Sequence, residues 1–177
     1  MSDQELLLYQ AFGNFMTENL FWRLLYINNA NFGTPLSSYA KNKLLSMDKS
    51  FENIISRIYP AKEGNELVVA VAQYNRLFIA YVDCLVSNCP EANKLNCEWE
   101  KGGQHIAQLL CKINPYWHKT EWSAMIKHET QLLNSIASNL QTRDYAAFVN
   151  TAPICRRLVI DMAEYLSAGI LKQREAR

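Results

Sequence analysis

The sequence predicts an all-α protein, an antiparallel helical bundle of four or more long helices with two short helices between the first and third. Only six glycines and five prolines occur in 177 residues, so few positions interrupt a helix. No stretch alternates between polar and apolar residues for long enough to indicate a β-sheet. The strongest positive signal is a heptad pattern over residues 62–87, in which apolar residues recur every three or four positions: Leu67, Val71, Tyr74, Phe78, Tyr81 and Leu85.

The N-terminal half is predicted to contain the first long helix and the two short ones. The long helix covers about residues 3–31 and ends before a glycine and a proline that disfavour its continuation. The short helices are expected at about 36–46 and 49–58, because Asp48 is a good N-cap for the second of them. Pro60 then ends this segment, and the heptad helix follows it.

The C-terminal half is predicted to contain three further helices, at about 90–113, 121–140 and 142–170. The glycine pair Gly102–Gly103 lies inside the first of them, where glycine allows a bend or the close approach of a neighbouring helix. Pro153 is expected to kink or split the last one, because proline lacks the N–H that a helix interior needs. The chain has no internal repeat and its length suits a single domain, so residues 1–177 are expected to form one helical-bundle domain.

Composition argues against several classes of protein. Hydrophobic residues make up 49% and charged residues 20% of the chain, as in a soluble globular protein. The formal net charge is +1, which does not favour nucleic acid or an anionic membrane. The longest apolar stretch, LFIAYVDCLV, contains Asp83 and is much shorter than a membrane span, and the N-terminus lacks the basic residues of a signal peptide. We therefore expect no nucleic-acid partner, no membrane insertion and a cytoplasmic location.

The cysteines predict neither a disulfide framework nor a structural zinc site. Their number is odd, and no two of them form a C-x-x-C pair. A reducing compartment is the default for such a chain. Each of the five is expected to pack as a small apolar core residue: Cys84, Cys89, Cys97, Cys111 and Cys155.

The segment INPYWHKTEW is predicted to form the turn between two antiparallel helices. Pro115 prevents the preceding helix from continuing, and Thr120 is a candidate N-cap for the next one. Tyr116 and Trp117 then lie in the turn, where aromatic side chains close the end of the bundle; a ligand-stacking platform is the alternative. Trp122 begins the apolar stripe of the following helix.

The same segment carries a resemblance to a protein family. INPYW, followed by EW and then His128, resembles a group of uncharacterised small helical proteins of spore-forming bacteria, some of which carry the label acetylglutamate kinase. DMAEYLSAGILKQ and FWRLLYINNA are also similar, so the resemblance runs from Trp22 to Gln173. It implies no established activity. The kinase label implies an α/β fold with glycine-rich phosphate loops, which cannot be found here, so the label is not transferred.

The family pattern implies histidines or acids at several inward-facing helix positions. This chain keeps His128, but it has Asn19 where a histidine is expected. It also has Asn75 and Arg76 in place of an acid and a histidine, and Arg156 in place of an acid. If the family site binds a metal, the resemblance therefore implies that this member has lost that ability.

Helix periodicity independently places a polar cluster inside the bundle. Glu129 lies within the apolar face of its helix, with His128 at the edge of that face, and Arg156 lies within the apolar face of the last helix. Glu129 and Arg156 are about equally far from the turn that joins their helices, so an antiparallel hairpin brings them level. Asn19 and Arg23 share the apolar side of the first helix.

This cluster has two interpretations. A charge alone in a core is costly, so the charged members should be paired. One interpretation is a buried ion-pair network, with Glu129 bonded to Arg156, that fixes the register of the helices. The other is a polar cavity that binds a small anionic or amphipathic ligand. The candidate ligand-binding residues are Asn19, Arg23, His128, Glu129 and Arg156.

Catalytic and metal-binding motifs are not found in the sequence. A di-iron carboxylate bundle needs E-x-x-H pairs, and there is none; nor is there a nucleophile elbow or an H-E-x-x-H motif. We therefore predict no catalytic residue, no metal site and no cofactor. The leading functional prediction is a non-catalytic bundle that acts through an unknown protein partner or self-association. The alternative is a small-ligand-binding protein or enzyme that uses the inner polar cluster.

Overall fold

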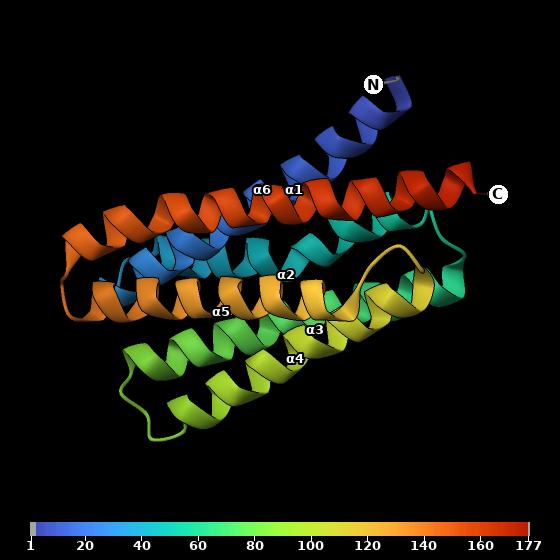
Figure 1. The fold of residues 1–177 in the computed structure, drawn as a ribbon. Helices are drawn as coiled ribbons and strands as arrows, with labels where there is room; N and C mark the ends of the chain where they lie inside the picture. The colour runs from blue at the N-terminus through green and yellow to red at the C-terminus, as the bar shows by residue number, and fades with distance from the viewer. Residues whose placement is uncertain (1–2, 177) are drawn as a thin grey trace.

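Figure 1 shows the fold of the computed structural model, which describes residues 3–176. Within these residues all regular secondary structure is α-helical, which confirms the predicted all-α antiparallel bundle. The helices are α1 (Asp3–Asn31), α2 (Leu36–Ile55), α3 (Ala61–Val86), α4 (Ala92–Ile113), α5 (Lys119–Gln141) and α6 (Tyr145–Glu175).

The helices form a closed ring, because each packs against the next in sequence and α6 packs back against α1. α1 also contacts α3 and α5 across the interior. In Figure 1 the N-terminal end of α1 projects beyond α6. Polar groups on the buried side of α1 can therefore meet those of α3 and α5.

The prediction of two short helices after α1 is wrong, because the structure has a single helix, α2, in that region. Asp48 lies inside this helix, where its carboxylate accepts from the backbone N–H of Lys49. A good N-cap residue did not start a helix here because the apolar stripe continues on both sides of it and packs against α1 and α3. The stripe consists of Ala40, Leu44, Met47, Phe51 and Ile55.

α6 is one continuous helix with Pro153 inside it, so of the two predicted outcomes, a kink or a split, the split is wrong. Pro153 and Val149 both lie on the exposed side of α6. The carbonyl of Val149 has no helical N–H donor, because proline lacks a backbone N–H, but on the exposed side of the helix water can hydrate this carbonyl. The helix also starts later than expected, because Asp144 caps it by accepting from the backbone N–H of Ala147 at 2.9 Å.

α3 and α4 pack closely through aromatic rings and a glycine. Trp99 of α4 is fully buried against three rings of α3, with centroids 5.2 to 5.7 Å away: Tyr74, Phe78 and Tyr81. A Cβ atom at Gly103 would lie 2.5 Å from Ile126 Cγ2 on α5 and 3.2 Å from the Tyr74 ring. The glycine pair therefore serves the close approach of helices, which is one of the two roles expected for it.

α3 is long and apolar enough, by length and composition alone, to cross a membrane. The prediction that no segment is long enough to span a membrane depends on uninterrupted apolar stretches alone. The full length of α3 corrects that prediction. Half of its most apolar window is buried inside the bundle, between α2 and α4. A core helix of a bundle can have the same apolar composition.

The turn between α4 and α5 closes one end of the bundle. The side-chain amide of buried Asn114 donates to the Tyr59 hydroxyl at 3.0 Å, and its Oδ1 accepts from the backbone N–H of Tyr116 at 2.9 Å. Trp117 is buried against the Tyr59 ring, which confirms that an aromatic residue of this turn plugs the bundle. α5 begins one residue before Thr120, so Thr120 is not its cap.

Candidate ligand-binding site

The centre of the bundle contains a buried ion pair that joins α1 to α5. Arg23 Nη1 lies 2.9 Å from Glu129 Oε1, and both side chains are almost fully removed from solvent. The second terminal nitrogen, Nη2, donates to Oδ1 of Asn75 on α3 at 2.8 Å. Arg23 therefore connects three helices, and its charge is balanced inside the core by Glu129.

Tyr74 completes the hydrogen bonding of Glu129. Its hydroxyl donates to Glu129 Oε2 at 3.2 Å and lies 2.9 Å from Oγ1 of Thr130, which itself donates to the carbonyl of Ile126. Burial, followed by the negative charge of Glu129, raises the pKa of Tyr74 far above its usual range, so the phenol stays protonated. Both carboxylate oxygens of Glu129 thus have a donor.

Two aromatic rings lie close to the guanidinium of Arg23. Arg23 Cζ lies 5.0 Å from the centroid of the Tyr74 ring and 5.3 Å from that of Phe78. These distances suit cation–π attraction, which is stronger when the cation is desolvated. One turn earlier on α1, the buried Asn19 amide lies 3.5 Å from Met47 Sδ, a weak acceptor. The charge of Arg23 is therefore held in one position by several contacts, whereas the amide of Asn19 has only one weak hydrogen bond.

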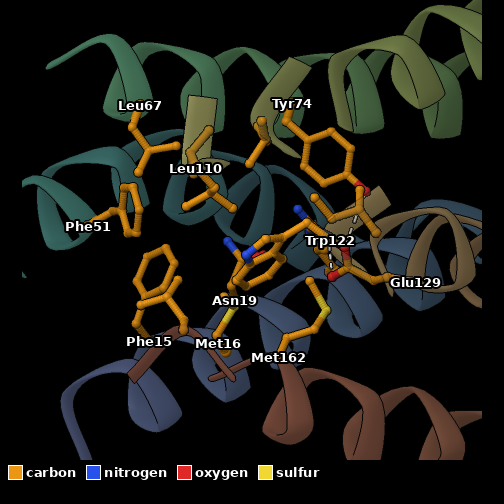
Figure 2. A pocket seen from close by; sticks show the side chains of 15 residues that line it. Phe15, Met16, Asn19, Phe51, Leu67, Tyr74, Leu110, Trp122, Glu129 and Met162 are labelled. Atoms are coloured by element: carbon orange, nitrogen blue, oxygen red, sulfur yellow. Dashed lines mark hydrogen bonds and ion pairs between the residues drawn. The ribbon is translucent and has the colours of Figure 1, made fainter. Parts of the chain in front are cut away.

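A cavity of about 70 Å³ lies beside this ion pair. Its lining is mostly apolar and comes from all six helices. In Figure 2, Tyr74 and Glu129 lie at one end of the cavity and Phe15 and Phe51 at the opposite end, with Trp122 between them. The cavity therefore has one polar end and one apolar end.

Three buried donors in this region have no acceptor among the described residues: Arg23 Nε, Asn75 Nδ2 and Trp122 Nε1. Arg23 and Trp122 line the cavity, and Asn75 is bonded to Arg23. A buried N–H without an acceptor costs about 1–3 kcal/mol. All three groups are donors, so the chemistry that this region lacks is a hydrogen-bond acceptor.

Three of the five predicted site residues are brought together. Asn19, Arg23 and Glu129 are buried and line the cavity. His128 is exposed and does not line the cavity, so the structure does not bring it together with the other candidate residues. A residue at the edge of an apolar face can fall on either side of the solvent boundary, and periodicity alone does not decide which.

The predicted pair of Glu129 with Arg156 is also wrong. Arg156 is exposed, because the buried face of α6 passes through Cys155 and Val159 instead. Val159, Ala163, Leu166 and Ile170 are buried on this face, so the helical phase after the proline is not shifted and Arg156 alone lies outside the buried face. Arg23 on α1 is the partner that Glu129 has.

Tyr74 and Asn75 belong to the candidate site but are not among the residues predicted for it. The heptad pattern assigns Tyr74 only to the core, and Asn75 enters only through the family pattern. A signal for Asn75 was present, because Ala72, Ile79 and Val82 at helical spacing from it form a second apolar stripe on α3. A helix that is buried on two faces presents a polar residue of the second stripe to the interior.

The site offers no reactive group. Glu129 accepts hydrogen bonds at both oxygens, and burial, followed by the charge of Glu129, raises the pKa of the nearby Cys155 thiol to about 12. That thiol is protonated at neutral pH and is a poor nucleophile. The histidines are exposed and away from the cavity: His105, His118 and His128. The arrangement suits binding rather than acid–base or nucleophilic catalysis.

Among the described residues, one group of metal-ligand type lies elsewhere, in the turn between α3 and α4. It consists of Cys84, Cys89 and Glu91, whose ligand atoms lie within 4.8 Å of one another. Cys84 and Cys89 form a disulfide, with Cα atoms 5.0 Å apart. The expectation that every cysteine is an unpaired core residue is therefore wrong for this pair, and Cys97 is exposed.

An apolar groove lies on the surface between α1 and α6, and we call it the α1/α6 groove. Phe21 and Val149 contribute to it and are 55% and 62% exposed. Arg156 lines the groove and makes no hydrogen bond or ion pair with any residue in the described part of the chain. Arg156, which helix periodicity predicts to be buried, is thus the charged residue of a surface groove.

No family model, no curated protein and no solved structure matches this chain. The resemblance to small helical proteins of spore-forming bacteria therefore stays a prediction that rests on its motifs. The fold and the site define the class of protein: an all-helical antiparallel bundle with a cavity beside a buried ion pair.

Proposed function

We propose that this protein is a non-catalytic helical bundle that binds a small neutral molecule in the cavity beside Arg23 and Glu129. One observation carries the proposal: Arg23 and Trp122 both line the cavity, and each carries a buried N–H group that has no acceptor among the described residues. A bound molecule with one carbonyl, hydroxyl or ether oxygen supplies what those groups lack. The apolar end of the cavity favours an alkyl body for the rest of the ligand.

The ligand is neutral because the charge of the site is already balanced. Arg23 and Glu129 neutralise each other at 2.9 Å. An additional carboxylate would lose its hydration without gaining a new counter-charge, which is strongly unfavourable in an apolar interior. The structure thus favours the amphipathic form of the predicted ligand over the anionic form.

The size of the cavity limits the ligand. An engineered cavity of about 150 Å³ in another protein holds benzene, so about 70 Å³ corresponds to roughly three heavy atoms. Met16 and Met162 line the cavity and have flexible side chains that can make room for a few more atoms. At roughly 1 kcal/mol per heavy atom, a four-atom probe should bind with a Kd of about 1 mM.

Acetone and acetate form a matched pair of probes, because they have the same shape and differ in charge. We expect acetone to shift the indole N–H resonance of Trp122 saturably in a ¹⁵N-labelled protein, with the other three tryptophans as internal references. Acetate should bind at least about tenfold more weakly. Equal shifts with the two probes, or no saturable shift with acetone, would contradict the proposal.

Two valine variants on α3 provide the structural control. Val71→Phe places a larger side chain in the cavity, whereas Val69→Phe makes the same change at an exposed position of the same helix. Acetone binding should be lost in the first and retained in the second. Saturable binding that survives Val71→Phe would place the acetone elsewhere on the protein.

A second candidate function, action through a protein partner, is favoured by the α1/α6 groove. Its exposed apolar residues and its unpaired Arg156 suit an amphipathic helix that carries an acidic residue. Self-association through the same groove is the competing outcome. The sequence predicted an unknown protein partner or self-association, without indicating the surface.

A charge reversal tests this second candidate. Synthetic amphipathic helices that differ only in one Glu or one Lys are titrated against the wild type and Arg156→Glu by fluorescence anisotropy. The Glu peptide should prefer the wild type and the Lys peptide the variant, each by about tenfold. If both peptides bind the wild type and Arg156→Glu with the same preference, an acidic helical partner is refuted. A concentration-dependent dimer in sedimentation that prevents peptide binding would refute it as well.

A further inference from the structure

The turn that ends α3 is held by its own backbone hydrogen bonds. Asn88 adopts a left-handed conformation with φ 54°. The backbone N–H of Cys89 donates to the carbonyl of Cys84 at 2.9 Å, and that of Asn88 donates to the carbonyl of Leu85 at 3.1 Å. This pair of bonds is the Schellman motif, which brings the side chains of the two outer residues together. Those outer residues here are Cys84 and Cys89.

The same motif without cysteines shows that the disulfide is not what creates this proximity. At the end of α1, Gly33 has φ 63°, and the backbone N–H of Thr34 donates to the carbonyl of Asn29. The side chains of Thr34 and Asn29, which occupy the positions of the cysteines, are hydrogen bonded to each other. The backbone of the turn therefore keeps the two outer side chains in contact when no covalent bond joins them.

α5 supports the α3 turn from outside. Gln141 Nε2 donates to the carbonyl of Leu85 at 2.9 Å and to Asn88 Oδ1 at 3.0 Å. These bonds do not involve sulfur, so they persist when the disulfide is reduced. Reduction should therefore leave Cys84 and Cys89 as two adjacent thiols on a preformed backbone.

Glu91 adds a third ligand atom to this pair. It is the residue before α4, and its carboxylate makes no capping hydrogen bond. One atom of each of Cys84, Cys89 and Glu91 lies within 4.8 Å of the others. Zinc ligands at 2.0–2.3 Å from the metal are separated by somewhat less than 4.8 Å but by more than a disulfide bond. After reduction, side-chain rotations must therefore move the two sulfurs apart and bring the Glu91 carboxylate closer. Cys89 and Glu91 also lie at the N-terminal end of α4, whose dipole favours a thiolate and a carboxylate.

We propose that reduced Cys84 and Cys89, together with Glu91, bind a thiophilic divalent cation of the zinc type, with water at the fourth position. A C-x₄-C spacing is within the range used for zinc, and three protein ligands with one open position are typical of exposed zinc sites. The prediction of no metal site depends on the absence of C-x-x-C, E-x-x-H and H-E-x-x-H motifs. It did not consider a pair that a helix C-terminus brings together.

Metal binding at this site is controlled by redox state. A dithiol reductant transfers two electrons and two protons to the Cys84–Cys89 bond, which gives two thiols and the disulfide of the reductant. Zn²⁺ then binds the two sulfurs and releases two protons to solvent. Oxidation of the pair removes both thiolate ligands, so the disulfide form seen in the structure does not hold the metal.

Cobalt is a suitable probe because thiolate–Co²⁺ coordination gives charge-transfer absorption in the near ultraviolet. The protein is reduced with dithiothreitol, freed of reductant without air and titrated with Co²⁺. We expect one Co²⁺ per chain with that absorption, displacement by Zn²⁺, and no such absorption in the oxidised protein. Absence of the band in the reduced protein, or equal binding by the oxidised protein, would overturn the proposal.

Variants identify the ligands. Cys89→Ser should abolish the band, and Glu91→Gln should weaken Co²⁺ binding by more than about tenfold. Cys97→Ser removes an exposed cysteine outside the site and should change nothing. Glu91→Gln retains both cysteines and is exposed, so it remains informative if Cys89→Ser does not fold. Wild-type affinity in Glu91→Gln, or loss of the band in Cys97→Ser, would refute the three-ligand site.

Discussion

Two ion pairs of this protein have the same length and opposite surroundings. Arg23–Glu129 in the interior and Lys112–Glu66 on the surface both have N···O distances of 2.9 Å. The side chains of the first pair are 4% and 9% exposed, and those of the second are 61% and 42% exposed. Distance is therefore not what distinguishes the two pairs. Removal of one partner leaves an unhydrated charge in the interior, whereas on the surface water replaces the partner.

The largest effect is expected for the interior pair. Glu129→Leu and Arg23→Met should each lower the free energy of unfolding by about 3–5 kcal/mol, because each leaves one charge alone in the core. The double variant should be much less destabilised than the sum of the two, since no charge remains unpaired. Urea unfolding in a double-mutant cycle measures this coupling.

Arg156→Met is the control for this cycle, because Arg156 is exposed. It should change stability by less than about 0.5 kcal/mol. A large effect of Arg156→Met, with small effects of the two interior variants, would mean that the interior pair does not form in solution.

A buried and an exposed cysteine extend the comparison to reactivity. Burial, followed by the charge of Glu129, raises the pKa of Cys155 to about 12, whereas Cys97 is exposed. A raised pKa lowers the thiolate fraction at any pH below it, by roughly a thousandfold for three pH units. A thiol reagent at mildly alkaline pH should modify Cys97 rapidly and Cys155 only after unfolding. Peptide mass mapping distinguishes the two, and fast modification of native Cys155 would show that the core around it opens.

Two glycines test how tightly the interior is packed. An added Cβ at Gly103 would lie 2.5 Å from Ile126, whereas at Gly13 nothing lies within 4 Å. Gly103→Ala should therefore destabilise the protein by about 1–3 kcal/mol. Gly13→Ala should stabilise it by roughly 0.5–1 kcal/mol, because alanine favours a helix interior. Thermal unfolding of both variants checks the sign, and equal signs would mean that α4 can move away from α5.

The smallest effect is expected for the surface pair. The hydrogen bond from Lys112 and its positive charge lower the pKa of Glu66, although the side chain is exposed to solvent. A lowered pKa gives stability above the unfolded pKa that is lost as the pH falls through the folded value. Glu66→Gln should slightly reduce the loss of stability on acidification, and added salt should remove the difference. A salt-independent difference would mean that Glu66 is less exposed in solution.

Periodicity predicted the elements best where a helix has one continuous apolar face. The bounds of α1 and the heptad face of α3 agree with the structure because local spacing determines both. It also placed Asn19, Arg23 and Glu129 in the interior, since each interrupts a strong stripe. It was wrong at Asp48, where a cap signal competed with a continuous stripe, and tertiary packing decided in favour of the longer helix.

The sequence by itself determined the class of fold and the presence of polar groups in the core, because both depend on residue spacing within single helices. Only the tertiary structure decided which groups meet. It paired Glu129 with Arg23 instead of Arg156, because the packing of α6 places Cys155 in the core and leaves Arg156 exposed. It also placed the cavity, which depends on how six helices fill a common volume. Contacts between helices are set by their mutual packing, and a single sequence records the periodicity of each helix but not its orientation towards the others.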